Sequence, residues 1–341
     1  VVLLIVAALC LLLWLQRFVV YTPQGAVLDF GLQPPTVTGA IPQRPADSYI
    51  NIEYPDDQPP ATQPPVVPDV PTIPEDPDIP DIPDDPILPE DGVLSGYYFN
   101  AAEVQDDPDG VLQQLQQLPA GTAVLVQLAN FWGYRYYTSE YGTEISEANR
   151  KKMDHVLEWL AESDLYVIGR MPAFRDYWYG LENVEDGIFN PNRMSLWMDE
   201  ERCYWLNPNA EGTLTYLISI VTELRTLGFD EVVFTDFRLP DTDAIYFEED
   251  RAETIRKAAE DLVRICTTDR FALSFVGNEI FPLPEGRSRL YAENVAAAEA
   301  AALAQRLGLE NPQTRLVFLT DLKDTRYDAY GVLRPLVLNT Q

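Results

Sequence analysis

The chain has 341 residues, with 54 acidic and 24 basic side chains and a formal net charge of −30. A nucleic-acid-binding surface is built from clustered Lys and Arg, and the sequence contains no basic run, so this composition argues against nucleic acid as a partner. The single histidine, His155, excludes a metal centre built from several histidines and argues against a Ser–His–Asp site.

The first segment is apolar. Residues 1–15 carry no charge, and Gln16 and Arg17 separate them from the apolar residues 18–21. A membrane-spanning helix needs about 20 apolar residues. We therefore expect residues 1–21 to be the truncated remainder of an uncleaved transmembrane anchor that places the rest of the chain outside the cell, with a cleaved signal peptide as the alternative.

The second segment, residues 22–91, is rich in proline and acid. Of the 28 prolines, 17 lie between Pro34 and Pro89, and no Lys or Arg occurs between Arg44 and Arg135. Proline fixes φ and removes a backbone donor, so such a segment is expected to be polyproline-like or disordered. We interpret it as an acidic linker that acts as a spacer.

Strand and helix patterns alternate from residue 92 to the end. Short apolar runs predict strands at residues 95–100, 122–129, 165–172, 229–237, 271–277, 315–320 and 332–338. Helical spacing predicts helices at residues 110–118, 146–162, 212–227, 251–266 and 287–307. Ser146 is placed to cap the second of these helices, and Gly228 to end the third.

This alternation predicts an α/β fold in which helices cover a parallel sheet. About 250 residues suit a (β/α)8 TIM barrel over residues 92–341. No glycine-rich phosphate loop follows any predicted strand, so no nucleotide or other cofactor is expected. Only six or seven strands can be counted, which means that the barrel is incomplete, that the C-terminus is cut, or that one strand is unrecognised.

The spacing of the three cysteines does not indicate a disulfide framework or a zinc site. Cys10 lies in the apolar segment, and Cys203 and Cys266 are far apart with no CxxC spacing, so neither a zinc site nor a set of disulfides is expected. A bridge between Cys203 and Cys266 is an alternative that the sequence does not favour.

Carboxylates follow the predicted strands, where the reaction centre of such barrels lies. Asp236 and Glu279 are the expected catalytic acid/base pair, because glycosidic bond cleavage needs two carboxyl groups facing one site. Asp321 and Arg170 are expected to bind substrate at the same mouth. Each has a structural alternative. Asp236 can form an ion pair with Arg238, and Arg170 can form one with a buried partner. Glu279 and Asp321 can cap the helices that follow their strands.

Aromatic residues cluster in the segments after the second and third predicted strands. Aromatic faces beside polar groups suit sugar rings, and packing of long loops onto the barrel is an equally weighted alternative. These residues are Phe131, Trp132, Tyr134, Tyr136, Tyr137, Phe174, Tyr177, Trp178, Tyr179, Trp197, Tyr204 and Trp205.

Three runs carry a family resemblance. LYVIGRMPAFRD at residues 165–176, WLNP at 205–208 and LGFDEVVFTDFRLP at 227–240 resemble the DUF4015 family, a glycoside hydrolase-like domain of bacterial surface proteins with patterns close to YVIARIVVFKD, WVDPYN and LGFDEIQFDYVRFP. The resemblance is clearest over residues 96–240. It implies a TIM barrel, carbohydrate as the substrate class and often an N-terminal membrane segment. The matched positions are Arg170, Asp176, Trp205, Pro208, Arg238 and Pro240. Of these, Arg170, Asp176, Trp205 and Arg238 are expected to bind substrate, and Trp132 is added from the aromatic loop.

Several family carboxylates are replaced. The family's fourth-strand Asp falls on Thr235, with Asp236 one position later, and a step of one residue reverses the face of a strand unless a bulge re-aims it. Other acidic or basic family positions fall on Gln127, Ala129, Asn130 and Asn207.

Two main interpretations follow from these observations. The first is a membrane-anchored extracellular glycoside hydrolase that acts on cell-wall or other polysaccharide through Asp236 and Glu279. The second is a non-catalytic carbohydrate-binding surface module that has lost its carboxylates. A structural spacer, with a mouth filled by side chains, is a third.

Overall fold

A computed structural model describes residues 19–22, 25–28, 92–277 and 283–336. The chain divides into two compact units, residues 1–75 and 76–341. In the first unit, the described residues form an antiparallel hairpin of β1 (Val19–Thr22) and β2 (Gly25–Leu28). Residues 19–21 of the predicted anchor lie in β1. Its other residues, and residues 23–24 and 29–91 of the predicted linker, lie outside the described residues, so the anchor and the linker stay predictions.

No helix within the described ranges is both long enough and apolar enough to cross a membrane.

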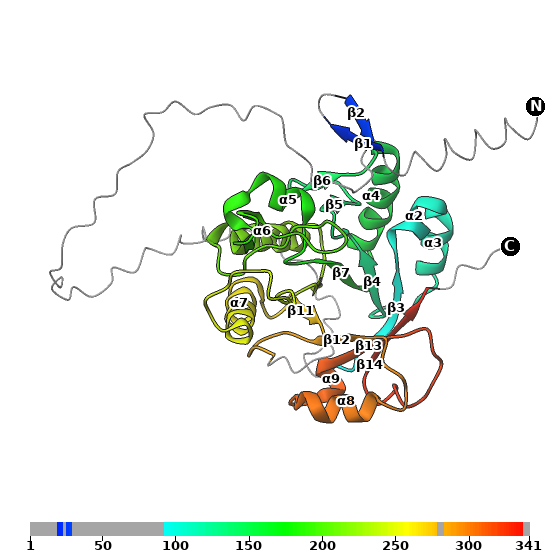
Figure 1. Ribbon diagram of the computed structural model, residues 1–341. Helices are drawn as coiled ribbons and strands as arrows, with labels where there is room; N and C mark the ends of the chain where they lie inside the picture. Colours follow the sequence, from blue (N-terminus) through cyan, green and yellow to red (C-terminus); the bar gives the residue numbers. More distant parts are fainter. Residues whose placement is uncertain (1–18, 23–24, 29–91, 278–282, 337–341) are drawn as a thin grey trace, which may run out of the picture. The chain divides into compact units, whose positions relative to one another are not determined.

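The second unit is a closed barrel of eight parallel strands (Figure 1). In chain order its strands are β3 (Ser95–Phe99), β4 (Ala123–Gln127), β7 (Tyr166–Pro172), β10 (Glu231–Thr235), β11 (Ala272–Val276), β12 (Leu290–Glu293), β13 (Leu316–Leu319) and β14 (Gly331–Pro335). Each strand pairs with its successor, and β14 closes the barrel on β3 through Val332 opposite Ser95. The predicted TIM barrel is therefore confirmed and is complete.

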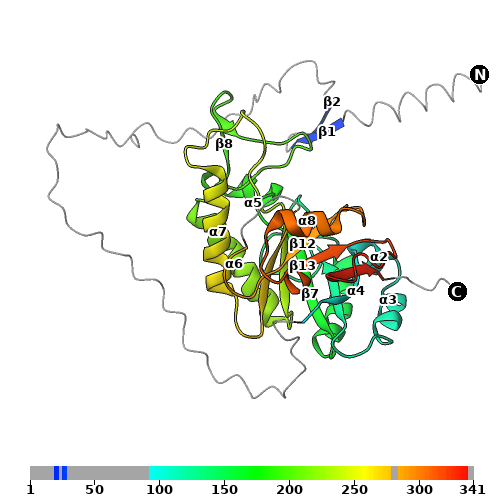
Figure 2. The ribbon, with the colours of Figure 1, turned by 90° about the horizontal axis from the view of Figure 1, so that it is seen from below.

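Helices follow most of the strands and pack on the outside of the barrel (Figures 1 and 2). They are α2 (Ala101–Asp106), α3 (Pro108–Leu115), α4 (Glu147–Ala161), α5 (Tyr177–Glu182), α6 (Glu211–Thr226), α7 (Arg251–Cys266), α8 (Ala300–Leu307) and α9 (Pro312–Arg315), with the short 3-10 helix η2 (Val184–Asp186) after α5. The segments after β4 and β7 also contain two small sheets, β5 (Tyr134–Arg135) with β6 (Thr143–Glu144) and β8 (Phe189–Asn190) with β9 (Ser195–Leu196).

The eighth strand was hidden inside a predicted helix. The alanine-rich run at 287–307 has helical composition, yet only its second half is helical, as α8, while its first half contains β12. Asn294 follows β12 with φ of 57°, a left-handed conformation that a helix cannot continue through. Of the three explanations for the missing strand, the unrecognised strand is correct.

The predicted helix ends hold in position. Ser146 occupies the N-cap of α4, although its side chain makes no capping hydrogen bond. Gly228 follows α6 with φ of 90°, which a residue with a Cβ adopts only with strain. The short helices α2 and α5 were not predicted. Each begins after a side-chain cap, Asn100 for α2 and Asp176 for α5.

Alternating residues of each strand fill the barrel interior. One buried apolar cluster inside the barrel includes Leu125, Ile168, Val233 and Tyr291, and the residues between them pack outward against the helices. Near the amino ends of the strands the interior is polar. There the Glu231 carboxylate, which is fully buried, accepts hydrogen bonds from several barrel side chains, and this set closes the lower end of the barrel. These donors are Tyr166, Ser274, Arg289 and Tyr291.

Candidate active site

A cavity of about 990 Å³ lies at the carboxyl ends of the barrel strands. It is lined by the ends of β4, β7, β10, β11 and β12 and by the segment that follows β10. Its polar lining residues are Gln127, Asn130, Arg170, Thr235, Asp236, Arg238, Asp241, Arg251 and Glu293. The mouth of this barrel is therefore open and polar, which does not fit the predicted alternative of a structural spacer with a filled mouth.

Asp236 lines this cavity directly after β10. Its φ is 51°, so the chain turns into the left-handed region at the residue that follows the inward-facing Thr235. Because of this turn, Thr235 and Asp236 both line the cavity although they are successive residues. The offset of one position from the family's Asp therefore does not turn Asp236 away from the mouth. The Thr235 hydroxyl donates a hydrogen bond of 3.1 Å to Asp236 Oδ2, which orients the carboxylate.

Arg170 and Glu293 form an ion pair inside the mouth. Arg170 Nη2 lies 2.7 Å from a carboxylate oxygen of Glu293, and both residues line the cavity. The two side chains come from β7 and β12, which are separated by β10 and β11 in the barrel, so the contact crosses the interior. Both side chains remain partly exposed, at 29% and 28%. Of the two interpretations of Arg170, the ion pair is present, and it lies in the site.

Tyr98, near the end of β3, interacts electrostatically with charged residues at the mouth of the barrel. Burial raises the pKa of its hydroxyl, and the carboxylates of Asp321 and Glu293 raise it further, while Arg170 opposes them. Asp321 itself is exposed after β13 and is not part of the cavity lining. Tyr98 therefore stays a neutral hydrogen-bond donor near the acidic groups at ordinary pH.

Glu279, the expected partner of Asp236, lies outside the described residues, and its catalytic role stays a prediction. The neutral replacements Gln127, Asn130 and Thr235 all line the cavity. Asn207 does not line it.

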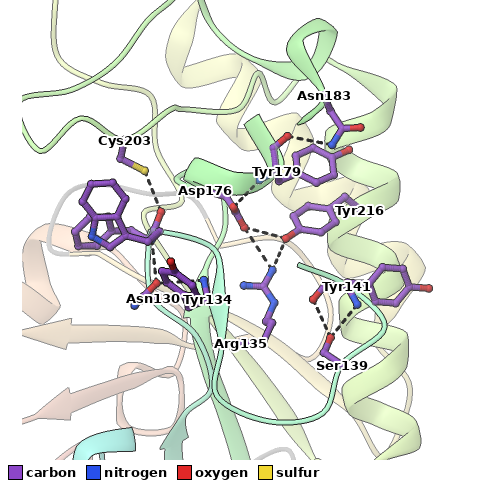
Figure 3. Close-up of polar contacts among 12 residues, drawn as sticks. Asn130, Tyr134, Arg135, Ser139, Tyr141, Asp176, Tyr179, Asn183, Cys203 and Tyr216 are labelled. Carbon is purple, nitrogen blue, oxygen red and sulfur yellow. Dashed lines mark hydrogen bonds and ion pairs between the residues drawn. The ribbon is translucent and has the colours of Figure 1, made fainter. Parts of the chain in front are cut away.

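Asp176 belongs to a different environment. It is only 4% exposed, and it caps α5 by accepting a hydrogen bond of 3.0 Å from the Tyr179 amide (Figure 3). Its other oxygen accepts one of 2.9 Å from the Tyr216 hydroxyl and pairs with Arg135, which is also buried. Figure 3 shows these side chains converging from β5, α5 and α6. Asp176 does not line the cavity, and we correct its expected substrate contact to a structural role.

Trp205 is also buried, at 3% exposure, and does not line the cavity. Its indole nitrogen donates a hydrogen bond of 2.9 Å to Asp199, which also pairs with Arg175. Although burial opposes it, the Cys203 backbone amide, the Trp205 indole and Arg175 together lower the pKa of Asp199. We therefore correct the expected role of Trp205 from direct substrate contact to support of the cavity wall.

Arg238 rests on this wall. Its Cζ lies 5.0 Å from the centre of the Trp205 ring, and its exposed side chain lines the cavity. It makes no hydrogen bond or ion pair with any residue that the structure describes. The predicted Asp236–Arg238 ion pair is therefore not formed, which leaves the guanidinium able to bind a ligand.

Most of the aromatic residues pack the loops instead of lining the cavity. Phe174, Tyr137 and Trp205 are buried. Trp132 is half-buried, 5.4 Å from Phe131 and 5.4 Å from Tyr177 between ring centres, and does not line the cavity. Phe131 alone of the predicted aromatic set lines it, so the loop-packing interpretation holds for the rest.

The two described cysteines are free thiols, so the bridge between them is not formed. Cys203 Sγ contacts the Phe131 carbonyl oxygen at 2.9 Å, and burial raises the pKa of both thiols, that of Cys266 to about 12. Neither residue lines the cavity.

Glu293 is the site residue that the sequence interpretation missed. Because its strand was assigned to a helix, its position at a strand end was not visible. The signal available was the short run LYAE, whose alternation puts Tyr291 and Glu293 on one face.

Comparison with known families and structures gives the following. The family DUF4015, described as "Putative glycosyl hydrolase domain", matches residues 114–281. No curated protein sequence matches the chain. Among solved structures, a hypothetical protein from Ruminiclostridium thermocellum ATCC 27405 is similar at 24% identity, over 53% of this chain and 96% of that one, with a TM-score of 0.45.

Two enzymes are more distant. A GH20 exo beta-N-acetylglucosaminidase from Vibrio harveyi has 9% identity over 73% of this chain and 51% of that chain, with a TM-score of 0.45. A GH36 alpha-galactosidase from Geobacillus stearothermophilus has 10% identity over 74% of this chain and 40% of that chain, with a TM-score of 0.48. This chain thus spans about half of these enzymes or less.

Proposed function

We propose that the barrel is a glycoside hydrolase that acts on a polysaccharide, and the match of residues 114–281 to the DUF4015 family supports this. The observation that carries the proposal is the polar cavity at the carboxyl ends of the strands, into which Asp236 and Glu293 bring carboxylates from two different strands. Two carboxyl groups in one cavity are the minimum equipment for glycosidic bond cleavage, since one protonates the leaving oxygen and the other attacks or activates water.

Asp236 is the proposed general acid. The left-handed turn at this residue and the hydrogen bond from Thr235 hold its carboxyl group against the cavity. A backbone conformation of this kind costs free energy in a non-glycine residue, and such strain is often found at functional sites. Arg238 and Phe131 supply a donor group and an apolar ring to the same cavity, a combination that suits a hydroxylated sugar ring.

We further propose that the apolar residues 1–15 tether the barrel to a membrane and that residues 22–91 hold it away from the surface outside the cell. The support is compositional: an uncharged N-terminal run followed by a linker that contains 17 of the 28 prolines. Fractionation tests this proposal. The full chain should remain in the membrane pellet after an alkaline wash, whereas a chain that starts at residue 22 should be released.

The alternative is a carbohydrate-binding module without turnover. The neutral side chains Gln127, Asn130 and Thr235 in the cavity lining favour it. The full chain, incubated with peptidoglycan, chitin, xylan, cellulose and dextran, separates the two functions. Release of new reducing ends supports the hydrolase. Binding without release in any of these samples supports the module.

A further inference from the structure

We propose that Glu293 is the second reacting carboxylate of the site, that it works in its ionised form, and that Arg170 is its positioning residue. This inference rests on the proposed function and makes it specific, because Glu293 lies outside the set of residues expected from the sequence. It assigns to Glu293 the role that was expected of Glu279.

Glu293 is the last residue of β12, and it faces inward with Tyr291 because the two are separated by one residue. Its carboxylate lines the same cavity as Asp236, which follows β10. Only β11 stands between these two strands in the barrel. Two carboxylates therefore enter one cavity from nearby strand ends.

A second ion pair inside the barrel, among the residues that the structure describes, is closed off from the cavity. Arg289 and Glu231 lie 2.8 Å apart with side-chain exposures of 4% and 0%, and both oxygens of Glu231 accept hydrogen bonds from barrel side chains. That pair is closed to any ligand. The Arg170–Glu293 pair has nearly the same length but keeps more than a quarter of each side chain exposed, next to the cavity.

Arg170 keeps one donor that its pairing with Glu293 does not use. Its Nε is buried and has no hydrogen-bond partner among the described residues. The same holds for Arg289 Nε in the closed pair, so the Arg170 donor is distinguished by its place on the cavity. Arg170 lines the cavity, so a ligand oxygen or an ordered water held there would satisfy this group. The guanidinium can then fix Glu293 and contact the ligand at once.

The chemistry follows from the ion pair. A carboxylate paired with an arginine carries negative charge, which suits the nucleophile or base of the reaction and not its acid. As nucleophile, a Glu293 oxygen bonds to the anomeric carbon while the glycosidic C–O bond breaks and the leaving oxygen takes the proton of Asp236. Water then adds to the anomeric carbon, giving one proton to Asp236 and releasing Glu293. As base, Glu293 takes a proton from the water that attacks that carbon.

The test uses the full chain and the polysaccharide from the five named above that the wild type degrades. Glu293→Gln should lower kcat by about 100-fold or more, in the range that general acid–base groups contribute. Glu260→Gln is the matched control, because Glu260 loses the same charge on the exposed surface of α7, where it pairs with Arg256 outside the cavity lining; its kcat should stay within about threefold of the wild type. Glu279→Gln is assayed beside them.

A chemical readout separates reaction from support. The substrate is a 4-nitrophenyl glycoside, whose leaving group needs no protonation. If Glu293 is the nucleophile, sodium azide should restore turnover of Glu293→Ala, because an azide nitrogen can bond to the anomeric carbon in place of the missing carboxylate oxygen. If Glu293 is the base, a small anion such as formate should restore turnover by taking the proton from water. Arg170→Lys should keep more activity than Arg170→Ala and shift the pH profile of kcat. A residue that only supports the fold would show neither rescue nor a shifted profile.

The outcomes are distinct. If the wild type degrades a polysaccharide and Glu293→Gln keeps more than a tenth of its kcat, the inference is wrong while the proposed function stands. Loss of activity in Glu279→Gln together with a retained Glu293→Gln would assign the second carboxylate to Glu279. If the wild type releases no reducing ends from any of the five polysaccharides, the proposed function fails and this inference fails with it.

Discussion

Arg170 of β7 and Glu293 of β12 lie 2.7 Å apart across the mouth of the barrel, although 122 positions of the chain separate them. Each comes from an inward-facing position near the carboxyl end of its strand. The sequence patterns predicted the strand of Arg170 and missed the strand of Glu293. The contact links the two sides of the cavity that also contains Asp236. The predictions below follow from this arrangement and from the buried networks beneath and beside it.

The two ion pairs inside the barrel should differ in their effect on stability. Glu231→Gln leaves Arg289 buried with an incomplete partner, so we expect it to lower the free energy of unfolding by about 3–5 kcal/mol. Glu293→Gln removes a partly exposed charge, and we expect a change below about 1 kcal/mol. Denaturant unfolding followed by circular dichroism measures both. Equal losses would mean that the upper pair is structural.

Asp176 should be a stability residue. Replacement of Asp176 by Ala removes the cap of α5 and leaves Arg135 buried without its carboxylate, so we expect a loss of about 3 kcal/mol or more. Asp321→Ala, an exposed carboxylate, is the control and should change stability by less than about 0.5 kcal/mol. Urea midpoints of the two variants provide the comparison.

The position of Asp176 leaves no room for a side chain at Gly133. A Cβ at this position would lie 2.2 Å from Asp176 Oδ1, and its φ is 82°. Gly133→Ala should therefore destabilise the chain, while Gly121→Ala, which has a similar φ of 75° and nothing within 4 Å, isolates the backbone cost alone. A thermal melt in which Gly133→Ala unfolds no earlier than Gly121→Ala would contradict the packing seen around Asp176.

Cys266 should be unreactive at neutral pH. Burial raises the pKa of its thiol from an ordinary value of 9.0 to about 12, so the folded chain binds a proton there that the unfolded chain releases above about pH 9. The contribution of this group to stability is complete below pH 9 and declines as the pH rises from 9 towards 12. In a Cys10→Ser, Cys203→Ser background, Ellman's reagent should label Cys266 at pH 8 only after unfolding. Rapid labelling of the folded chain would contradict its burial.

Arg238 should contribute to substrate binding more than to turnover. Its guanidinium is exposed on the cavity and is held over the Trp205 ring, so it can donate hydrogen bonds to a bound sugar. We expect Arg238→Ala to raise KM about 10-fold, which corresponds to about 1.4 kcal/mol, with kcat within about threefold of the wild type. Arg264→Ala, whose arginine pairs with Asp261 on the surface of α7, should change neither constant.

The sequence was sufficient for the fold because its strands are buried on both faces. Residues 123–126 and 232–234 are apolar at every position, and they lie in β4 and β10. β12 was missed because it has only four residues and adjoins an alanine-rich run that forms α8. Local composition favoured a helix there, but these residues form a strand because they pair with β11 and β13.

The candidate site was predictable only in part, because the sequence does not show where a side chain points or whether it is buried. Asp236, Arg170 and Arg238 follow or end strands, and all three line the cavity. Asp176 and Trp205 looked equivalent to the site residues in the sequence. The Asp176 carboxylate, however, bonds to Tyr216 of α6, and the Trp205 indole turns to Asp199 of its own segment, so neither side chain lines the cavity.

The release of reducing ends by Asp236→Asn tests the central claim most directly, because the substitution replaces a carboxyl group of the cavity with an amide of almost the same volume. In the full chain, assayed on the polysaccharide that the wild type degrades best, we predict that Asp236→Asn lowers kcat at least about 100-fold while binding and the unfolding midpoint stay close to those of the wild type. Turnover by Asp236→Asn within about threefold of the wild type would contradict the assignment of this cavity as a carboxylate-driven active site.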